Sequence, residues 1–333
     1  MRAKAIIHKK AFPLAARGLW RKYYRAIQSG DLESALDAAQ EAERIFRNKS
    51  DRRHSSILRR AVSNVLFLQG HHAEALKAAE KSIKLAARDD YERALSISWL
   101  AAMNSMLGNT QQALSQFEDA VKIAECFTTD SYLWSYIFGA RAAAFRRSGS
   151  YDRALLDWQG AAAMLEKDGQ LWRAAAYLNN MGWLLAQIGR SDEAQAILLN
   201  ALEFVGRDPH LTTKAAILDS LGYVLGRAGN HVGAIRALQK AVRYFEKLGD
   251  QKELAKARLH LADLFNTTGN ASRASGEIAS VVNIARSLAD KSLLDQAEAR
   301  LNTLDVNTKA RTAGISHQTD GKLMGQFSRG FNV

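Results

Sequence analysis

Residues that could carry out chemistry are few in this chain, and they stand apart from one another. His71 and His72 are adjacent in a predicted turn, but no Cys, Asp or third His stands at the spacing of metal ligands. Gly321-Lys322 lacks the upstream glycine and the following helix that a phosphate-binding loop needs. The chain contains no Gly-x-Ser-x-Gly elbow and no His-Glu-x-x-His. We therefore expect no enzymatic activity, no bound metal and no cofactor.

The single cysteine is the remaining candidate for reactivity. Cys126 excludes an intramolecular disulfide, so nothing suggests a small secreted domain held by disulfide bonds. It falls late in a predicted helix beside Phe127. We expect Cys126 to be buried as a small hydrophobic side chain rather than to react.

Basic residues are concentrated at the N-terminal end. The formal net charge is +12, and residues 1–60 hold 15 Lys/Arg against 6 Asp/Glu, whereas residues 61–304 hold 27 against 26. A nucleic-acid groove needs positive charge along its whole length, so nucleic acid is not the expected partner. The basic end is interpreted first as a solvated face of a terminal element, and alternatively as a docking site for an acidic partner, phosphate or anionic membrane. Its candidate residues are Arg17, Arg21, Arg25, Arg52 and Arg53.

The elements that carry these residues follow a repeat. Glycines recur at steps of 38 to 41 residues, and an alanine stands five residues after each of them. Seven residues before the glycine the side chain is small in six of seven copies, the exception being Tyr23 in the first. A fixed period of this length predicts a solenoid of stacked structural units. The glycines are Gly30, Gly70, Gly108, Gly149, Gly189, Gly229 and Gly269.

Residues 177–204 show what one unit contains. Apolar residues recur at helical spacing on both sides of Gly189, which predicts two helices joined by a tight turn. Gly189 suits the left-handed end of the first helix, and Ser191 is expected to cap the second helix through its side chain. Gly182 and Ala194 are small where the two helices would cross. We therefore predict an all-α, right-handed superhelical solenoid of about seven helix pairs.

This pattern resembles the tetratricopeptide repeat (TPR), with Phe117 and Trp158 at the aromatic position of the second helix. The resemblance covers roughly residues 12 to 290. The period is near 40 rather than about 34 residues, and the usual proline between repeats is absent. The chain is therefore more similar to the extended variant found in kinesin light chain, Rap-type bacterial regulators and the sensor domains of maltose-activator-type transcription factors.

The resemblance implies that partners bind on a concave surface lined by the first helix of each pair. Its Asn, Arg and aromatic side chains would hold an extended or helical acidic segment of a protein or peptide. It is not the carboxylate clamp of chaperone-binding repeats, because Asn180 alone matches part of that motif. The residues that the resemblance places there are Trp20, Tyr24, Arg60, Asn64, Trp99, Tyr136, Arg146, Arg147, Asn179, Asn180, Trp183, Asp219, Tyr223, Arg227, His260, Asp263 and Asn266.

Three functional hypotheses follow from these residues. The favoured one is a non-enzymatic scaffold or adaptor that binds a protein or peptide segment through the concave surface. The second is a signalling regulator that responds to a ligand or peptide. The third is attachment to nucleic acid or an anionic surface through the basic end, which would depend steeply on salt.

The chain divides into three predicted parts. Residues 1–11 form a basic N-terminal segment, residues 12–304 form the solenoid with a capping helix from Lys291 to Leu304, and residues 305–333 form a disordered tail. No apolar run approaches the ~18 residues that a membrane span requires. We expect a cytoplasmic protein; the acid-poor N-terminus leaves an organelle transit peptide as the alternative.

Overall fold

The computed structural model of this protein describes residues 14–48 and 51–312. These residues form fifteen α-helices and one short 3-10 helix, and none of them lies in a strand. The all-α fold class predicted from the sequence is therefore confirmed. The predicted basic segment 1–11 and residues 313–333 of the predicted tail lie outside the described residues.

The chain divides into two compact units, residues 1–168 and residues 169–333. The first unit contains four helix pairs, and the second contains three pairs and a final single helix. In the first unit the helices are α1 (Leu14–Ser29), α2 (Leu32–Asn48), α3 (Arg52–Leu68), α4 (His72–Leu85), α5 (Asp90–Met106), α6 (Thr110–Ala124), η1 (Glu125–Phe127), α7 (Ser131–Arg147) and α8 (Tyr151–Lys167). In the second unit they are α9 (Leu171–Gln187), α10 (Ser191–Arg207), α11 (Leu211–Arg227), α12 (His231–Leu248), α13 (Gln251–Thr267), α14 (Ala271–Ser287) and α15 (Lys291–Thr312).

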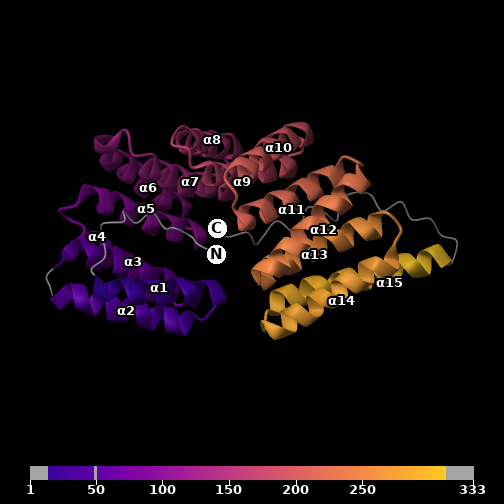
Figure 1. Ribbon diagram of the computed structural model, residues 1–333, viewed down its shortest axis with the longest axis horizontal. Helices are drawn as coiled ribbons and strands as arrows, with labels where there is room; N and C mark the ends of the chain where they lie inside the picture. Colours follow the sequence, from indigo (N-terminus) through magenta and orange to yellow (C-terminus); the bar gives the residue numbers. More distant parts are fainter. Residues whose placement is uncertain (1–13, 49–50, 313–333) are drawn as a thin grey trace. The chain divides into compact units, whose positions relative to one another are not determined.

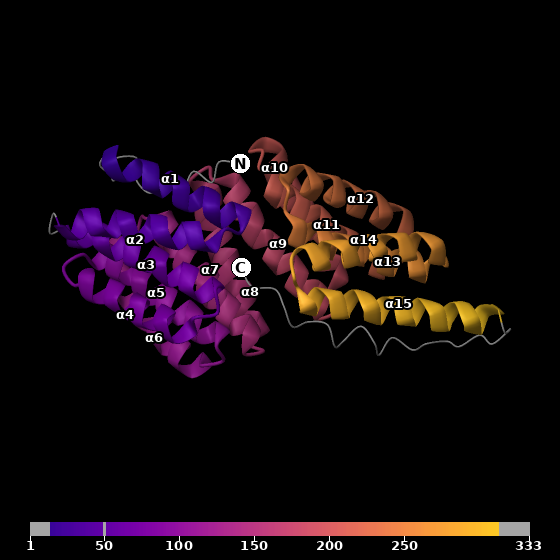
Figure 2. The ribbon, with the colours of Figure 1, turned by 90° about the horizontal axis from the view of Figure 1, so that it is seen from below.

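Each odd-numbered helix from α1 to α13, here called a first helix, packs most extensively on the even-numbered second helix that follows it. Second helices also contact the next first helix, as α2 does α3 and α12 does α13. First helices contact one another directly, α3 with α5 and α5 with α7 in the first unit, and α9 with α11 and α11 with α13 in the second (Figures 1 and 2). The first helices from α3 to α7, and those from α9 to α13, therefore form a layer within each unit.

The repeated glycines make the turn inside each pair. All seven have positive φ; Gly189, for example, has a φ of 85°. Only glycine adopts this left-handed conformation without a Cβ penalty, so the glycine position ends each first helix. The backbone N–H of Arg190 then donates to the Leu185 carbonyl, 2.9 Å away, which closes the turn.

The capping prediction for Ser191 is wrong by one residue. Ser191 is the first residue of α10, and the capping position is occupied by Arg190, which makes no side-chain capping bond. The turn after the glycine is a single residue long, so the cap falls directly after the glycine. In the next two pairs Asn230 and Asn270 stand at that place and accept hydrogen bonds from the backbone of their helices.

The small residues of the repeat allow close helix packing. A Cβ added to Gly182 would lie 2.6 Å from Leu198 Cγ, and one added to Gly222 would lie 2.5 Å from Leu238 Cγ. The alanines five residues after each turn glycine are fully buried between the paired helices: Ala35, Ala75, Ala113, Ala154, Ala194, Ala234 and Ala274. The repeat pattern in the sequence thus records which positions lie at the helix crossings.

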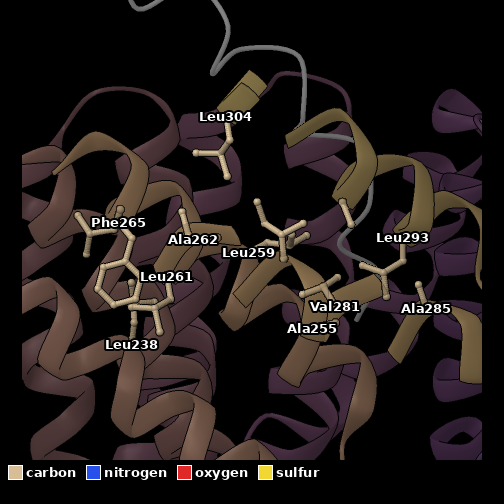
Figure 3. Close-up of a cluster of buried hydrophobic side chains, with 14 of the residues drawn as sticks. Leu238, Ala255, Leu259, Leu261, Ala262, Phe265, Val281, Ala285, Leu293 and Leu304 are labelled. Carbon is tan, nitrogen blue, oxygen red and sulfur yellow. The ribbon is translucent and has the colours of Figure 1, made fainter. Parts of the chain in front are cut away.

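The second unit ends with α15, which covers the last pair. Leu293, Ala297 and Leu304 of α15 are buried in one cluster with residues of α13 and α14, such as Leu259 and Val281 (Figure 3). This confirms α15 as the predicted capping helix. The helix extends to Thr312 rather than ending near Leu304, so residues 305–312 are helical and not part of a disordered tail.

Cys126 is exposed, contrary to the prediction that it is buried. Helix α6 ends at Ala124, and the 3-10 turn η1 takes over from Glu125. Ala124 is fully buried as the last member of the apolar stripe of α6. Cys126 stands two residues after Ala124, about 200° further round a helix, so it lies on the face opposite this stripe.

Candidate partner-binding site

In the first unit the layer of first helices carries aromatic side chains on α1. The Trp20 and Tyr23 rings are stacked with centroids 5.1 Å apart, and the Tyr24 ring meets Trp20 edge-on at the same distance. Asn64 of α3 donates from Nδ2 to the Tyr23 hydroxyl at 3.2 Å. Trp20, Tyr24 and Asn64, which the sequence assigned to the binding surface, therefore come together and are half-buried.

Arg60 of α3 is paired with side chains of α5. Its guanidinium donates to Glu92 Oε2 and to Ser96 Oγ of α5, both at 3.2 Å. Burial is the largest single influence and disfavours the charged guanidinium, but the charge and hydrogen bond of Glu92 together with Tyr136 and Tyr132 outweigh it, so the pKa of Arg60 is raised. Arg60 therefore remains a cation beneath the surface.

Tyrosines of α1 and α7 share the surroundings of Arg60. Burial raises the pKa of Tyr24 and raises the pKa of Tyr136 to about 12, while the positive charge of Arg60 opposes both shifts. Tyr132 also contributes to raising the pKa of Tyr24 and of Tyr136. Side chains from α1, α3 and α7 thus act on one another electrostatically, although they are far apart in the sequence.

Trp99, Arg146 and Arg147 form the other end of the predicted surface in this unit. Trp99 donates from Nε1 to Ser63 Oγ at 3.2 Å, and Arg147 donates from Nε to Ser105 Oγ at 3.0 Å. Burial lowers the pKa of Arg146; burial and the neighbouring Arg146 lower the pKa of Arg147 to about 10. These residues are half-buried, and the hydrogen bonds of Trp99 and Arg147 fix side-chain orientation while part of each side chain stays accessible to a partner.

The second unit brings three rings together on its first helices. Trp183 of α9 and Tyr223 of α11 have ring centroids 4.7 Å apart. His260 of α13 packs on both, 5.7 Å from Trp183 and 5.6 Å from Tyr223. All three are half-buried, so one continuous aromatic surface spans three successive first helices.

Asp219 fixes the orientation of the His260 ring. His260 Nδ1 lies 2.9 Å and 3.1 Å from the two carboxylate oxygens of Asp219. Burial is the largest single influence and lowers the pKa of His260, but the charge and hydrogen bond of Asp219 together with the charge of Asp263 outweigh it, so the pKa is raised above its ordinary value of 6.5. A protonated His260 then donates to the carboxylate from the face that carries the aromatic rings.

Amides and a second ion pair flank the aromatic surface. Asn179 and Asn180 of α9 are half-buried, and the Oδ1 atom of Asn179 is buried without a hydrogen-bond partner among the described residues. Asp263 of α13 accepts two hydrogen bonds from Arg300 of α15, at 2.8 and 3.0 Å. Asn266, at the end of α13, is half-buried.

Arg227 reaches back over its own helix. It donates from Nη1 to the Tyr223 hydroxyl at 3.2 Å, and its guanidinium lies 5.9 Å from the centroid of that ring. Arg227 therefore borders the aromatic surface of the second unit at the C-terminal end of α11.

The predicted basic end is only partly a free basic surface. Arg53 pairs with Asp89 at 3.2 Å, Arg59 pairs with Glu43, and Arg52 donates to the Lys84 carbonyl at 3.4 Å. On α3, Arg53 and Arg59 therefore have carboxylate partners from other helices, whereas Arg52 donates to a backbone carbonyl. Four basic side chains of α1 are exposed: Arg17, Arg21, Lys22 and Arg25.

Some residues of these surfaces were missed from the sequence. Arg300 stands 40 residues after His260, so continuing the repeat register into α15 would have found it. Glu92 and Ser96 hold Arg60 but carry no signal of their own, because acidic residues and serines are common on helices. Among the described residues no group of three His, Cys, Asp or Glu side chains is arranged to hold a metal ion, and no helix is long and apolar enough to cross a membrane.

Comparison with known families agrees with the helix-pair architecture. The family model described as anaphase-promoting complex subunit 5 matches residues 19–105, 87–133 and 223–308, together more than half of the chain. The chain belongs to this family, which is TPR-like, and the resemblance to tetratricopeptide repeats is confirmed. No protein with a curated description matches the sequence.

Solved structures share the fold. BtubC (BKLC) from P. vanneervenii has a TM-score of 0.56 and 18% identity, with 66% of this chain and 91% of that chain covered. A STAND signal-transduction ATPase with a tetratricopeptide repeat sensor, from Pyrococcus horikoshii, has a TM-score of 0.63 and 14% identity, with 92% of this chain and 51% of that chain covered. A Rap protein complexed with competence and sporulation factor has a TM-score of 0.53 and 13% identity, with 88% and 98% covered. At these identities the comparisons establish the fold and no more.

Proposed function

We propose that this protein is a non-enzymatic scaffold or adaptor that binds a protein or peptide segment on the first-helix layer of its units. The observation that carries this proposal is the continuous aromatic surface of Trp183, Tyr223 and His260, half-buried on three successive first helices. Clustered aromatic side chains with an exposed edge are typical of residues that dominate binding energy at protein interfaces.

The amides beside the rings support a peptide as the bound segment. A buried carbonyl oxygen without a partner, such as Asn179 Oδ1, costs about 1–3 kcal/mol. A backbone N–H of a bound segment would satisfy this oxygen after a small rotation of the amide. Asn180, the next residue, offers both a donor and an acceptor.

The family match supports a role within an assembly. The family description names a subunit of the anaphase-promoting complex. We infer by analogy that this chain acts as a non-catalytic subunit or adaptor, with its first-helix layers holding segments of neighbouring proteins. Residues 1–13 and 313–333 are not needed for this proposal.

The test is affinity capture with matched variants. Purified protein and the Asn180→Ala/Trp183→Ala variant are each used to capture partners, with Val232→Ala as the control, because Val232 is 63% exposed on the second helix α12. Circular dichroism establishes that all three are folded. We expect one protein to be captured by the wild type and the control and lost with the double variant, and its purified form to bind at least about tenfold more weakly to that variant. Equal capture by all three proteins would contradict the proposal.

Attachment through the basic end is the second candidate. It is favoured by the exposure of Arg21, Lys22 and Arg25 on α1, which have no carboxylate partner among the described residues. An Arg21→Glu/Arg25→Glu variant in the same capture experiment separates the two functions. Loss of capture with this variant, combined with retention in the Asn180→Ala/Trp183→Ala variant, would identify the basic end as the functional surface.

A further inference from the structure

The exposed face of α1 carries positive charge that the helix itself does not balance. Arg21, Lys22 and Arg25 are all exposed, and α1 contains no Asp or Glu. None of the three has a carboxylate partner among the described residues. Arg21 and Arg25 are about one helical turn apart, which is about 6 Å along the axis, so they project from the same side of the helix.

The opposite face of α1 packs on its own repeat. Ala16, Tyr23 and Ala26 are buried. Ala16 shares a hydrophobic cluster with Phe46 of α2, and Tyr23 and Ala26 share another with Val62 of α3. Because the buried and the basic positions lie on opposite sides of the helix, packing holds the basic face outward at the edge of the first unit (Figure 2).

The sequence before and within α1 extends this charge. Residues 1–30 hold eight Lys/Arg and no Asp or Glu. The first acid is Asp31, in the turn after α1. Its pKa is lowered mainly by hydrogen bonds from Ser34, and the charge of Lys22 makes the smallest contribution. A cluster of Lys/Arg without acids attracts an anionic surface.

The form of this face favours an anionic bilayer over an acidic protein segment. No hydrogen bond to a described residue fixes the side chains of Arg21, Lys22 and Arg25. Binding one peptide would require these long side chains to be ordered around it, which costs side-chain entropy. A bilayer presents many headgroups to the same face and requires no single arrangement of the side chains.

Aromatic and apolar residues beside the charge also favour a bilayer. Trp20 and Tyr24 are half-buried next to the basic positions of α1. Trp and Tyr are enriched at the headgroup level of membranes. In the sequence of residues 2–12, Ile6, Ile7 and Phe12 are interspersed with Lys and Arg. This combination of cations and apolar side chains is typical of segments that lie at a bilayer surface.

We propose that α1, with the basic residues that precede it, docks on the surface of an anionic phospholipid bilayer through Arg21, Lys22 and Arg25. The guanidinium and ammonium groups would bind the phosphate and carboxylate groups of the lipid headgroups. This inference rests on the second candidate function, attachment through the basic end, and names its occupant. It is independent of segment binding on the first-helix layer.

The test is co-sedimentation of the full-length protein with vesicles. One set contains phosphatidylcholine with about one third phosphatidylserine, and the other contains phosphatidylcholine alone. We expect binding to the first set and little binding to the second. Binding should fall steeply as NaCl rises from about 50 to about 500 mM, because salt screens the attraction. Equal binding to both sets, or no binding to either, would overturn the proposal.

A variant assigns the binding to α1. Arg21→Gln/Arg25→Gln removes two exposed charges and keeps good helix formers, so the helix is retained. Each Lys/Arg near an anionic surface changes the affinity about fivefold, so this variant should bind phosphatidylserine vesicles about thirtyfold more weakly. Binding equal to that of the wild type would overturn the proposal.

Exposed lysines of α4 offer a matched control. Lys77→Gln/Lys81→Gln removes the same total charge from the first unit, but Glu74 and Glu80 stand beside these lysines in the helix. This variant should bind phosphatidylserine vesicles like the wild type. Equal weakening in both variants would mean that net charge alone causes binding, and would overturn docking through α1.

Acylation of lysines locates the contact. Lys22, Lys77 and Lys81 are exposed, so an N-hydroxysuccinimide ester should modify all three in the free protein, as read by mass spectrometry. We expect phosphatidylserine vesicles to protect Lys22 and to leave Lys77 and Lys81 reactive. A Lys22 that reacts equally with and without vesicles would overturn the proposal.

Further outcomes separate this inference from neighbouring explanations. The Asn180→Ala/Trp183→Ala variant should bind vesicles like the wild type, and weaker binding would refute docking through α1 alone. If the wild type binds no vesicles while Arg21→Glu/Arg25→Glu still loses a captured protein, the basic end remains a functional surface and the bilayer is refuted as its occupant. Binding of a hexaglutamate peptide that requires Arg21 and Arg25, without vesicle binding, would identify an acidic protein segment instead.

Discussion

Gly182 lies at the crossing of α9 and α10, and replacing it with alanine tests the packing that the repeat pattern implies. The added Cβ would lie 2.6 Å from Cγ, 2.8 Å from Cδ2 and 3.2 Å from Cδ1 of Leu198. Leu198 is fully buried, so it has no solvent-filled space into which it can move. One of the two helices must therefore shift.

The two opposing effects have known sizes. Alanine at an interior helix position is favoured over glycine by about 1 kcal/mol. Overpacking a well-packed core costs about 1–3 kcal/mol. Three atoms of Leu198 would lie inside or near the limit of contact, so we take the upper part of the range for overpacking. After the gain in helix propensity is subtracted, Gly182→Ala should lower the free energy of unfolding by about 1–2 kcal/mol.

Gly276 offers a matched control in the same unit. It lies within α14, and a Cβ added there would meet no atom within 4 Å. Gly276→Ala should therefore raise the free energy of unfolding by up to about 1 kcal/mol through helix propensity alone. The two substitutions are chemically identical and are expected to have opposite effects.

The assay is urea unfolding followed by circular dichroism in the helical band, with a double-mutant cycle between Gly182 and Leu198. Leu198→Ala alone should cost about 2–5 kcal/mol. Adding Gly182→Ala to that variant should raise the free energy of unfolding by up to about 1 kcal/mol through helix propensity, because the atoms that clash are gone. The reasoning would be refuted if Gly182→Ala stabilised the protein as Gly276→Ala does, or if the effects of the two substitutions at the crossing were additive.

Three further outcomes are expected. The Asp219–His260 pair stabilises the folded protein fully below the ordinary histidine pKa of 6.5, and this stabilisation is lost as the pH rises through the raised pKa of His260. In urea titrations, Asp219→Asn should therefore lower the free energy of unfolding more at about pH 5.5 than at about pH 9. Asp263→Ala breaks the double hydrogen bond to Arg300 of α15 and should lower the free energy of unfolding by about 1–3 kcal/mol, whereas no change would mean that the pair does not anchor α15. Cys126 is exposed, so Ellman's reagent should titrate one thiol per chain without denaturant, and a thiol that reacts only in urea would contradict its position in η1.

The helices and their turns could be predicted because the same physical constraint selects the same type of residue in each of the seven repeats. A turn that needs positive φ selects glycine, as at Gly189 and Gly229, and a helix crossing selects small side chains, as at Gly182 and Ala194. These constraints act between residues that are close in the sequence. They can therefore be recognised in the sequence without knowing how neighbouring helix pairs pack on one another.

Which charged side chains form ion pairs could not be predicted in the same way. Arg53 was assigned to a basic surface, yet it pairs with Asp89 from the following repeat. Such pairing depends on how far one helix pair is rotated against the next, which the repeat pattern leaves unspecified. Cys126 was misplaced for a different reason: the prediction followed the general tendency of cysteine to be buried, although two residues after the buried Ala124 it lies on the opposite face of the helix.

The contacts within each unit also bear on how such a chain changes over evolutionary time. The principal contacts join a helix to the next helix in the chain or to the one after that, as α11 meets α12 and α13. A helix pair of about 40 residues can therefore be duplicated or deleted with disturbance only of its packing against the neighbouring pairs. Chain length should consequently drift among relatives in whole repeats, while α15, whose buried residues match only the last pair, stays at the end. Each gain or loss would change how many binding positions the first-helix layer offers, and leave the remaining positions intact.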